Sequence, residues 1–355
     1  MIPIIVINTA MFLSVFLWAA DNGVNQEASS ECLACHGEKD VGALRFYDGK
    51  KKSVFIDSKV WNSSVHTGRL SCVDCHREIS GYPHPSVKYK DGEEYTAVKT
   101  ETCKRCHYTH YTRLLDSIHY EVLKNGGSGA PGCVECHGSH GIQKAATPRI
   151  SINEKCGQCH GDVDSEYRNS VHGKALVDEN NQDVPVCSDC HSAHDIRNPT
   201  DIEYKVNSYK LCGKCHGDAE RMKKYNLNPD VLTTYLEDFH GASNQLYSTG
   251  AEVPGKLVAV CTDCHGYHSI ESVHLPGQAE KVRENVLKTC QKCHQGAMPA
   301  FGDAWLSHYK PTLATAPLVW GVKWFYNIVI PFIVLGLVLH ILLDLWRYGV
   351  RRRKG

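Results

Sequence analysis

The chain has no excess of either charge, and it has no cysteine outside one short motif. Its 355 residues include 39 Lys and Arg against 39 Asp and Glu, so the formal net charge is +0. A balanced charge excludes the basic face by which proteins usually bind nucleic acids, and we predict no nucleic-acid partner. The chain also lacks sustained alternation of apolar and polar residues, so few or no strands are expected.

Cysteine is the abundant residue, and all 18 cysteines lie in C-x-x-C-H units. The nine units are Cys32/Cys35/His36, Cys72/Cys75/His76, Cys103/Cys106/His107, Cys133/Cys136/His137, Cys156/Cys159/His160, Cys187/Cys190/His191, Cys212/Cys215/His216, Cys261/Cys264/His265 and Cys290/Cys293/His294.

C-x-x-C-H is the attachment signature of c-type haem. Two thiols about one helical turn apart can add across the two vinyl groups of one porphyrin, and the next residue directs its imidazole at the iron. A disulfide framework does not require a histidine after every second cysteine, and structural zinc sites do not show this adjacency. A thioredoxin-like site uses a single C-x-x-C. The motifs therefore predict nine covalently attached c-type haems.

A second set of histidines repeats with the motifs. One kind lies in "SVH", "SIH", "SVHG" or "FHG" after an odd-numbered motif, and the other follows an even-numbered motif closely, as in "CHGSH". Nine irons need nine sixth ligands, and the repeat supplies nine histidines, which predicts bis-histidine ligation throughout. These predicted sixth ligands are His66, His84, His119, His140, His172, His194, His240, His268 and His308.

Two details of this assignment stay open at the level of sequence. His110, in "CHYTH", is an alternative to His119. His140 lies about one helical turn beyond His137 and cannot reach the far face of the same porphyrin, so it is expected to serve a neighbouring haem or none.

Both ends of the chain are apolar. Residues 1–20 end in small residues before Asp21 and are interpreted as a signal peptide, with a retained anchor as the alternative because a basic n-region is missing. The 20 residues Trp324–Leu343 contain no Lys, Arg, Asp or Glu, which is long enough to span a bilayer. The basic residues Arg347, Arg351, Arg352, Arg353 and Lys354 follow it and predict a cytoplasmic C-terminus.

These features predict the domain organisation and the location. We expect a signal peptide at 1–20, a periplasmic nine-haem domain at 21–317, a transmembrane helix at 318–346 and a basic cytoplasmic tail at 347–355. The expected fold is mostly α-helical and irregular, packed around haem, with one C-terminal transmembrane helix. The chain is then a single-pass protein of the inner (cytoplasmic) membrane. The ninth motif lies about 30 residues before the span, so the His294 haem is expected nearest the membrane.

The phrases "CVDCH…PHP", "SVHG" and "CSDCHSAHDI" resemble the multihaem c-type cytochrome superfamily of anaerobic respiration, in its class III and tetrahaem quinol-dehydrogenase-like groups. The C-terminal "GLVLHILLDLWRYGVRRR" resembles the anchor of periplasmic multihaem cytochromes that associate with b-type cytochromes. The resemblance implies electron transfer between the quinone pool and periplasmic or extracellular acceptors. Quinol-dehydrogenase types differ in having an N-terminal anchor and fewer haems.

Two functions fit these observations. In the first, the chain is an electron carrier without catalytic residues, which receives electrons through a membrane subunit, such as a b-type cytochrome or another quinol-oxidising protein, and passes them to soluble periplasmic redox partners. In the second, it is a terminal reductase of a small nitrogen or sulfur oxyanion, which requires an iron with an open position. The sequence contains no C-x-x-C-K and offers nine sixth ligands, which favours the carrier.

The motif count makes a direct prediction about cofactor load. The intact mass of the denatured, processed chain is expected to equal the apoprotein mass plus nine haem masses, because the thioether bonds survive denaturation. A mass with seven or fewer haems would show that some motifs are not used.

Overall fold

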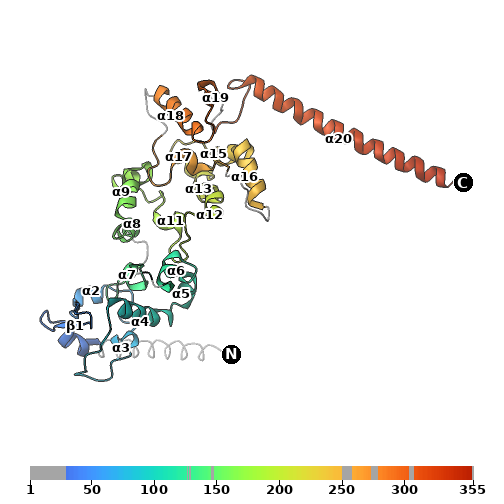
Figure 1. The fold of residues 1–355 in the computed structure, drawn as a ribbon. Helices are drawn as coiled ribbons and strands as arrows, with labels where there is room; N and C mark the ends of the chain where they lie inside the picture. The colour runs from blue at the N-terminus through green and yellow to red at the C-terminus, as the bar shows by residue number, and fades with distance from the viewer. Residues whose placement is uncertain are drawn as a thin grey trace, which may run out of the picture. The chain divides into compact units, whose positions relative to one another are not determined.

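The computed structural model describes residues 29–125, 127, 129–144, 148–249, 258–272, 279–303 and 308–353 (Figure 1). In these residues the chain is mostly helical and has two short strands, which confirms the expected fold class. The signal peptide predicted at 1–20 lies outside the described residues. The chain forms two compact units, Met1–Tyr204 with Tyr267–Glu271, and Lys205–Gly266 with Ser272–Gly355. Unit 1 therefore contains the first six motifs, and unit 2 contains the last three.

Unit 1 begins with a helical segment at 29–36 and a two-stranded antiparallel sheet. Its strands are β1 (Ala43–Arg45) and β2 (Lys51–Ser53), and Leu44 faces Lys52 in the register. The helices that follow are α2 (Ser58–Asn62), α3 (Cys72–Cys75), α4 (Gly92–Lys104), α5 (Tyr108–Leu114), α6 (Ile118–Lys124), α7 (Cys133–His137), α8 (Ile150–Gly157), α9 (Gly161–Asn169), α10 (Val171–Val177) and α11 (Cys187–His191). Helix α12 (Ile202–Val206) spans the boundary between the two units.

Unit 2 contains the remaining helices. They are α13 (Ser208–His216), α14 (Ala219–Lys224), α15 (Val231–Glu237), α16 (Phe239–Thr249), α17 (Cys261–His265), α18 (Ala279–Gln291), α19 (Pro299–Asp303) and α20 (Pro317–Arg352). Helix α20, the long terminal helix in Figure 1, has 36 residues and is long and apolar enough to cross a membrane. It contains the predicted span Trp324–Leu343.

The even-numbered motifs begin short helices, and an acidic residue inside each motif explains why. The carboxylate at the third helical position accepts a hydrogen bond from the backbone N–H just before the first cysteine, which satisfies a donor that the helix itself leaves unpaired. The distances are 2.7 Å for Ser71 to Asp74, 2.8 Å for Gly132 to Glu135, 2.7 Å for Val186 to Asp189 and 2.9 Å for Val260 to Asp263.

The odd-numbered motifs have the opposite placement, at the ends of helices. Helices α4, α8 and α18 each end within a residue or two of the first cysteine of a motif, and α13 ends at the motif histidine. Two kinds of motif helix therefore alternate along the chain.

The segments that carry the predicted sixth ligands of the "SVH" type are held by side-chain caps. The Ser64 and Ser117 hydroxyls accept from the backbone N–H groups of His66 and His119, at 3.3 and 3.2 Å. Ser170 caps α10 in a similar way, and Asp238 accepts from the N–H of Gly241 at 2.8 Å. The serine or aspartate of each phrase thus fixes the start of the helix on which the histidine lies.

Backbone hydrogen bonds join successive repeats of unit 1. In three places, the residue before a histidine of the "SVH" type donates its N–H to the carbonyl of an isoleucine that lies two residues after a predicted sixth ligand of the next repeat. These contacts are Val65 to Ile142 at 2.8 Å, Ile118 to Ile196 at 2.8 Å and Val171 to Ile270 at 2.9 Å. The same register recurs, so the spacing between repeats is fixed by the backbone.

Few apolar side chains are buried in the described residues, as expected of a chain packed around haem. Val186 and Val260 are among the most buried, at 2% and 1% exposure, and each immediately precedes an even-numbered motif. A tyrosine hydroxyl donates to the carbonyl just before each valine, Tyr167 to Pro185 at 2.5 Å and Tyr235 to Ala259 at 3.1 Å. The two units therefore support these motifs in the same way.

The glycine of the "HG" phrase is needed for close packing, which gives a stability prediction. A Cβ atom on Gly173 would lie 1.9 Å from the Tyr167 carbonyl oxygen. Gly173→Ala is expected to lower the free energy of unfolding by roughly 1–3 kcal/mol, because the preceding helix must move away. Gly92→Ala is the control, since nothing lies within 4 Å of that Cβ position. Denaturant midpoints measure both, and equal midpoints would contradict the prediction.

Candidate haem-binding sites

Most motif histidines lie ring to ring with a second histidine from elsewhere in the chain. In the described residues there are eight such pairs, with 6.0–6.3 Å between ring centroids, and each joins a motif histidine to one predicted sixth ligand. The pairs are His36 with His84, His76 with His140, His107 with His66, His137 with His194, His160 with His119, His191 with His268, His265 with His308 and His294 with His240.

The ring separation fits an iron between the two histidines. A transition metal binds an imidazole nitrogen at about 2.0 Å, so two rings on opposite sides of one metal have centroids about 6 Å apart. In the described residues, no group of three or more His, Cys, Asp or Glu side chains is arranged to hold a metal ion. Two axial histidines leave four equatorial positions, which a porphyrin fills. The donor set therefore fits haem.

The pairing follows one rule along the chain. After an even-numbered motif, the nearby histidine pairs with the motif two places earlier, as His140 does with His76. After an odd-numbered motif, the histidine of the "SVH" type pairs with the motif two places later, as His66 does with His107. Each pair therefore joins neighbouring repeats, and His140 lies opposite a neighbouring motif, as its position required.

The alternative between His110 and His119 is decided by position. The His119 ring lies 6.2 Å from that of His160. His110 lies 4.7 Å from His194 and 6.2 Å from His107, three residues before it in the chain. His66 is already at 6.1 Å from His107, so His110 is an additional ring beside two pairs.

The pairing in unit 2 differs from the order expected from the sequence. His308, which lies closest before α20, is opposite His265 of the eighth motif, and His240 is opposite His294 of the ninth. Proximity in sequence to the span suggested the ninth motif, but the shift of two motifs assigns the segment before the span to the eighth. Met298, after the ninth motif, is 71% exposed.

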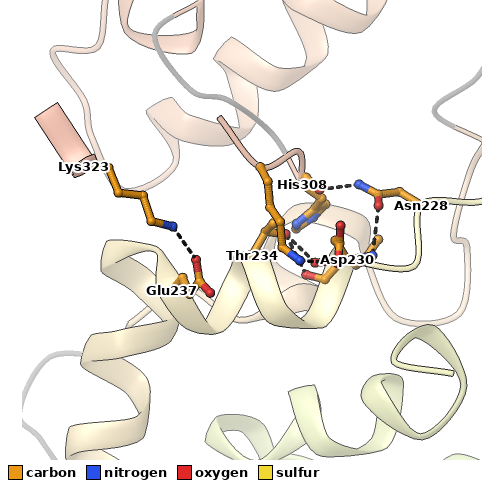
Figure 2. Close-up of polar contacts among 8 residues, drawn as sticks. Asn228, Asp230, Thr234, Glu237, His308 and Lys323 are labelled. Atoms are coloured by element: carbon orange, nitrogen blue, oxygen red, sulfur yellow. Dashed lines mark hydrogen bonds and ion pairs between the residues drawn. The ribbon is translucent and has the colours of Figure 1, made fainter. Parts of the chain in front are cut away.

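Figure 2 shows how His308 is held in unit 2. The Asn228 side-chain amide donates to the His308 carbonyl, and the Asn228 carbonyl oxygen accepts from the backbone N–H of Asp230 at 2.9 Å. Lys310 forms an ion pair with Asp230 at 2.6 Å, and Lys323 of α20 reaches Glu237 of α15 at 3.3 Å. The loop before α15 and the start of α20 thus position the His308 segment together.

Burial keeps many of these imidazoles neutral. It lowers the pKa of His76, His137, His191 and His265, and it lowers the pKa of His140 to about 4, with the neighbouring His76 as a second cause. A neutral imidazole has the lone pair that binds a metal, so the paired rings are in the form that ligation requires.

Cysteines of consecutive motifs lie close to one another. In unit 1, the Cys103 thiol donates to Cys133 and lowers its pKa to about 7, and Cys187 has the same effect on Cys156. The other neighbouring cysteine pairs are Cys32 with Cys72, Cys75 with Cys106 and Cys136 with Cys156 in unit 1, and Cys212 with Cys261 and Cys264 with Cys290 in unit 2. Within each unit, motifs that are adjacent in sequence are therefore adjacent in space.

The two cysteines of a motif differ in exposure, although the sequence gives both the same role. Every first cysteine is half-buried, whereas the second cysteine is exposed in eight of the nine motifs. The exception is half-buried Cys215, whose Sγ accepts a hydrogen bond from the Arg221 guanidinium at 2.9 Å. The outer thiol of most motifs is therefore accessible.

The cysteines and the histidine of a motif also do not converge on one point, since the described residues form no cluster of three metal-ligating side chains. This agrees with thiols that bond to the porphyrin edge rather than to a metal. The second cysteines of five motifs show the difference from the sequence expectation, because exposure or a guanidinium contact, not a partner motif, is their main feature. They are Cys35, Cys159, Cys190 and Cys293, which are exposed, and Cys215. Their attachment to haem stays a prediction from the motif.

His172 and His216 lie in different units. His172 is on α10 of unit 1, and His216 ends α13 of unit 2. The role of His172 as a sixth ligand stays a prediction. All 18 cysteines lie in the described residues and none forms a disulfide, as attachment to haem requires.

Sequence reasoning missed the polar partners of the motif histidines. Val54 offers its carbonyl to His36 Nδ1 at 2.9 Å, Tyr204 places its hydroxyl 3.2 Å from His191 Nδ1, and Glu78 lies 3.4 Å from His76 Nδ1. Only Glu78 had a signal in the sequence, as an acidic residue two positions after a motif histidine in "CHRE".

Comparison with known proteins supports this interpretation. Residues 127–217 match the family model of cytochrome c3, a family of multihaem cytochromes. This segment contains the fourth to seventh motifs. No curated protein matches the chain, and no solved structure does. The match indicates c-type haems and multihaem electron transfer as the class of function.

The pairing of His308 gives a spectroscopic prediction. His308→Ala is expected to open one coordination position at the eighth motif, so the reduced protein binds about one carbon monoxide per chain. His240→Ala is expected to open the ninth in the same way, and the double variant is expected to bind two. One carbon monoxide in the double variant would show that both histidines serve the same iron.

His110→Ala is the matched control. It removes a ring beside His107 and His194 that belongs to neither pair, so no carbon monoxide binding and no high-spin signal are expected.

Proposed function

We propose that this chain is a membrane-anchored nonahaem cytochrome c that carries electrons from the quinone pool to periplasmic or extracellular acceptors in anaerobic respiration. The observation that carries the proposal is the set of eight histidine pairs at iron-binding separation in a chain whose motifs are adjacent in sequence order. Nine motifs give nine haems, with His172 as the ninth predicted sixth ligand. Each bound haem supplies a one-electron iron couple.

The pairs favour a carrier over a reductase. A reductase must bind its substrate at an open or exchangeable position on a metal. At each of the eight sites described, two imidazoles lie at the separation that fills both axial positions, which leaves no position for a nitrogen or sulfur oxyanion. Bis-histidine ligation also lacks the methionine that raises haem potential, so low potentials suited to menaquinol-linked chains are expected.

The arrangement of the motifs supports transfer along the chain. The cysteines that would attach neighbouring haems contact or lie beside one another, as Cys103 and Cys133 do in unit 1 and Cys212 and Cys261 do in unit 2. Because each histidine pair also joins two repeats, a change in one repeat is felt by the site of the next. A chain of closely spaced sites is the form that electron conduction needs.

The membrane part of the proposal rests on α20. The helix is apolar enough to span a bilayer, and its last turns carry Arg347, Arg351 and Arg352. By the positive-inside rule its C-terminus is cytoplasmic, which puts the motifs on the periplasmic side.

The span has only one histidine, His340, whereas a transmembrane b-type haem normally needs two. We therefore propose that a separate membrane subunit, a b-type cytochrome or another quinol-oxidising protein, oxidises the quinol and binds α20. Soluble periplasmic redox partners then accept electrons from the chain. Since His308 lies nearest to α20 and pairs with His265, entry at the eighth motif replaces the expected entry at the ninth.

Removal of the span tests this proposal. A chain lacking residues 318–355 is expected to be soluble, to keep nine haems and to be reduced by dithionite, but not by menaquinol in the presence of membranes. The control lacks only residues 347–355, keeps the span and is expected to retain reduction by menaquinol. Full-rate reduction of the chain without 318–355 by menaquinol would show that no docked membrane partner is needed.

A further inference from the structure

The second motif has an ion pair beside its histidine that no part of the function described so far uses. Lys99 on α4 is the only buried lysine in the described residues, with 8% of its surface exposed. Its ammonium lies 2.6 Å from Glu78 Oε1, and the Tyr95 and Tyr89 rings lie at 5.7 and 6.0 Å. A lysine is rarely buried unless it is paired, so Glu78 is the reason that Lys99 can be there.

The same carboxylate oxygen faces the motif histidine. His76 Nδ1 lies 3.4 Å from Glu78 Oε1 and 3.4 Å from Lys99 Nζ. With Nε2 directed toward the iron between His76 and His140, Nδ1 carries the proton and can only donate. The lysine ammonium can also only donate, so both groups converge on one acceptor, Glu78.

Other motif histidines have neutral partners at the same nitrogen. His36 Nδ1 faces the Val54 carbonyl, and His191 Nδ1 faces the Tyr204 hydroxyl. Glu78 is a carboxylate, whose negative charge draws the Nδ1 proton more strongly and makes the imidazole a better electron donor to a metal. The second motif is thus built differently from its neighbours.

We propose that Glu78 and Lys99 are positioning residues that set the reduction potential of the second-motif haem. Glu78 lowers this potential by increasing the electron donation of His76, and Lys99 limits the effect by neutralising the carboxylate. The proposal rests on the proposed function, because it requires haem at this motif. It makes the second site distinct in potential along the chain.

The two partners predict shifts of opposite sign. In an optical redox titration of the full-length chain, Glu78→Gln is expected to raise the midpoint of one component, equal to about one ninth of the haem absorbance. Lys99→Met, which keeps the buried stem but removes the charge, is expected to lower the same component. Lys99→Arg keeps the positive charge and is expected to stay close to the wild-type midpoint.

His140→Met identifies the component. Methionine opposite His76 is expected to raise the midpoint of the second-motif haem alone, since methionine–histidine ligation raises haem potential. The component that moves in this variant must be the one that moves in Glu78→Gln and Lys99→Met. The controls are Asp48→Asn and Lys50→Met, an exposed ion pair of unit 1 at 3.5 Å, for which no shift is expected.

Failure of this proposal differs from failure of the proposed function. Each variant is first checked for nine haems by intact mass and for a low-spin spectrum. With these intact, unchanged midpoints, shifts of the same sign, or a shift in a different component from that of His140→Met would overturn the role of Glu78 and Lys99 only. Absence of haem from the wild-type chain would overturn the proposed function.

Discussion

An iron with two axial imidazoles needs two histidines about 6 Å apart, and much of this structure follows from that requirement. A motif histidine is fixed beside its own cysteines, so its partner must come from elsewhere in the chain. In eight described sites, that partner belongs to the neighbouring repeat, and the centroid separation varies only from 6.0 to 6.3 Å. The chain is therefore linked from repeat to repeat by the ligands themselves.

Local devices make this repetition possible. An acidic residue inside each even-numbered motif starts a helix at the first cysteine, and a serine or aspartate starts the helix of the next sixth ligand. Backbone bonds such as Val65 to Ile142 then hold one repeat against another in the same register. Because these contacts are backbone and polar, few apolar side chains are needed to fix the arrangement, and stability depends on the cofactor as well as on the chain.

Uniform ligation does not make the sites identical. The partner of Nδ1 is a carbonyl at His36, a hydroxyl at His191 and a carboxylate shared with a buried lysine at His76. Such partners adjust the donor strength of an axial histidine without changing the ligand. A carrier with one type of ligand can in this way have different potentials along its length.

Much of the site was predictable from the sequence, because the chemistry is local. Cysteine spacing and the adjacent histidine define haem attachment, the count of repeated histidines predicted their number, and a run of apolar residues predicted α20. Which histidine lies opposite which could not be predicted, because the pairing joins residues far apart in the chain, such as His191 and His268. His308 shows the difference: its position suggested the ninth motif, but the loop at Asn228 and the shift between repeats place it opposite His265. Sequence determined the ligands, and the packing of one repeat on the next decided their partners.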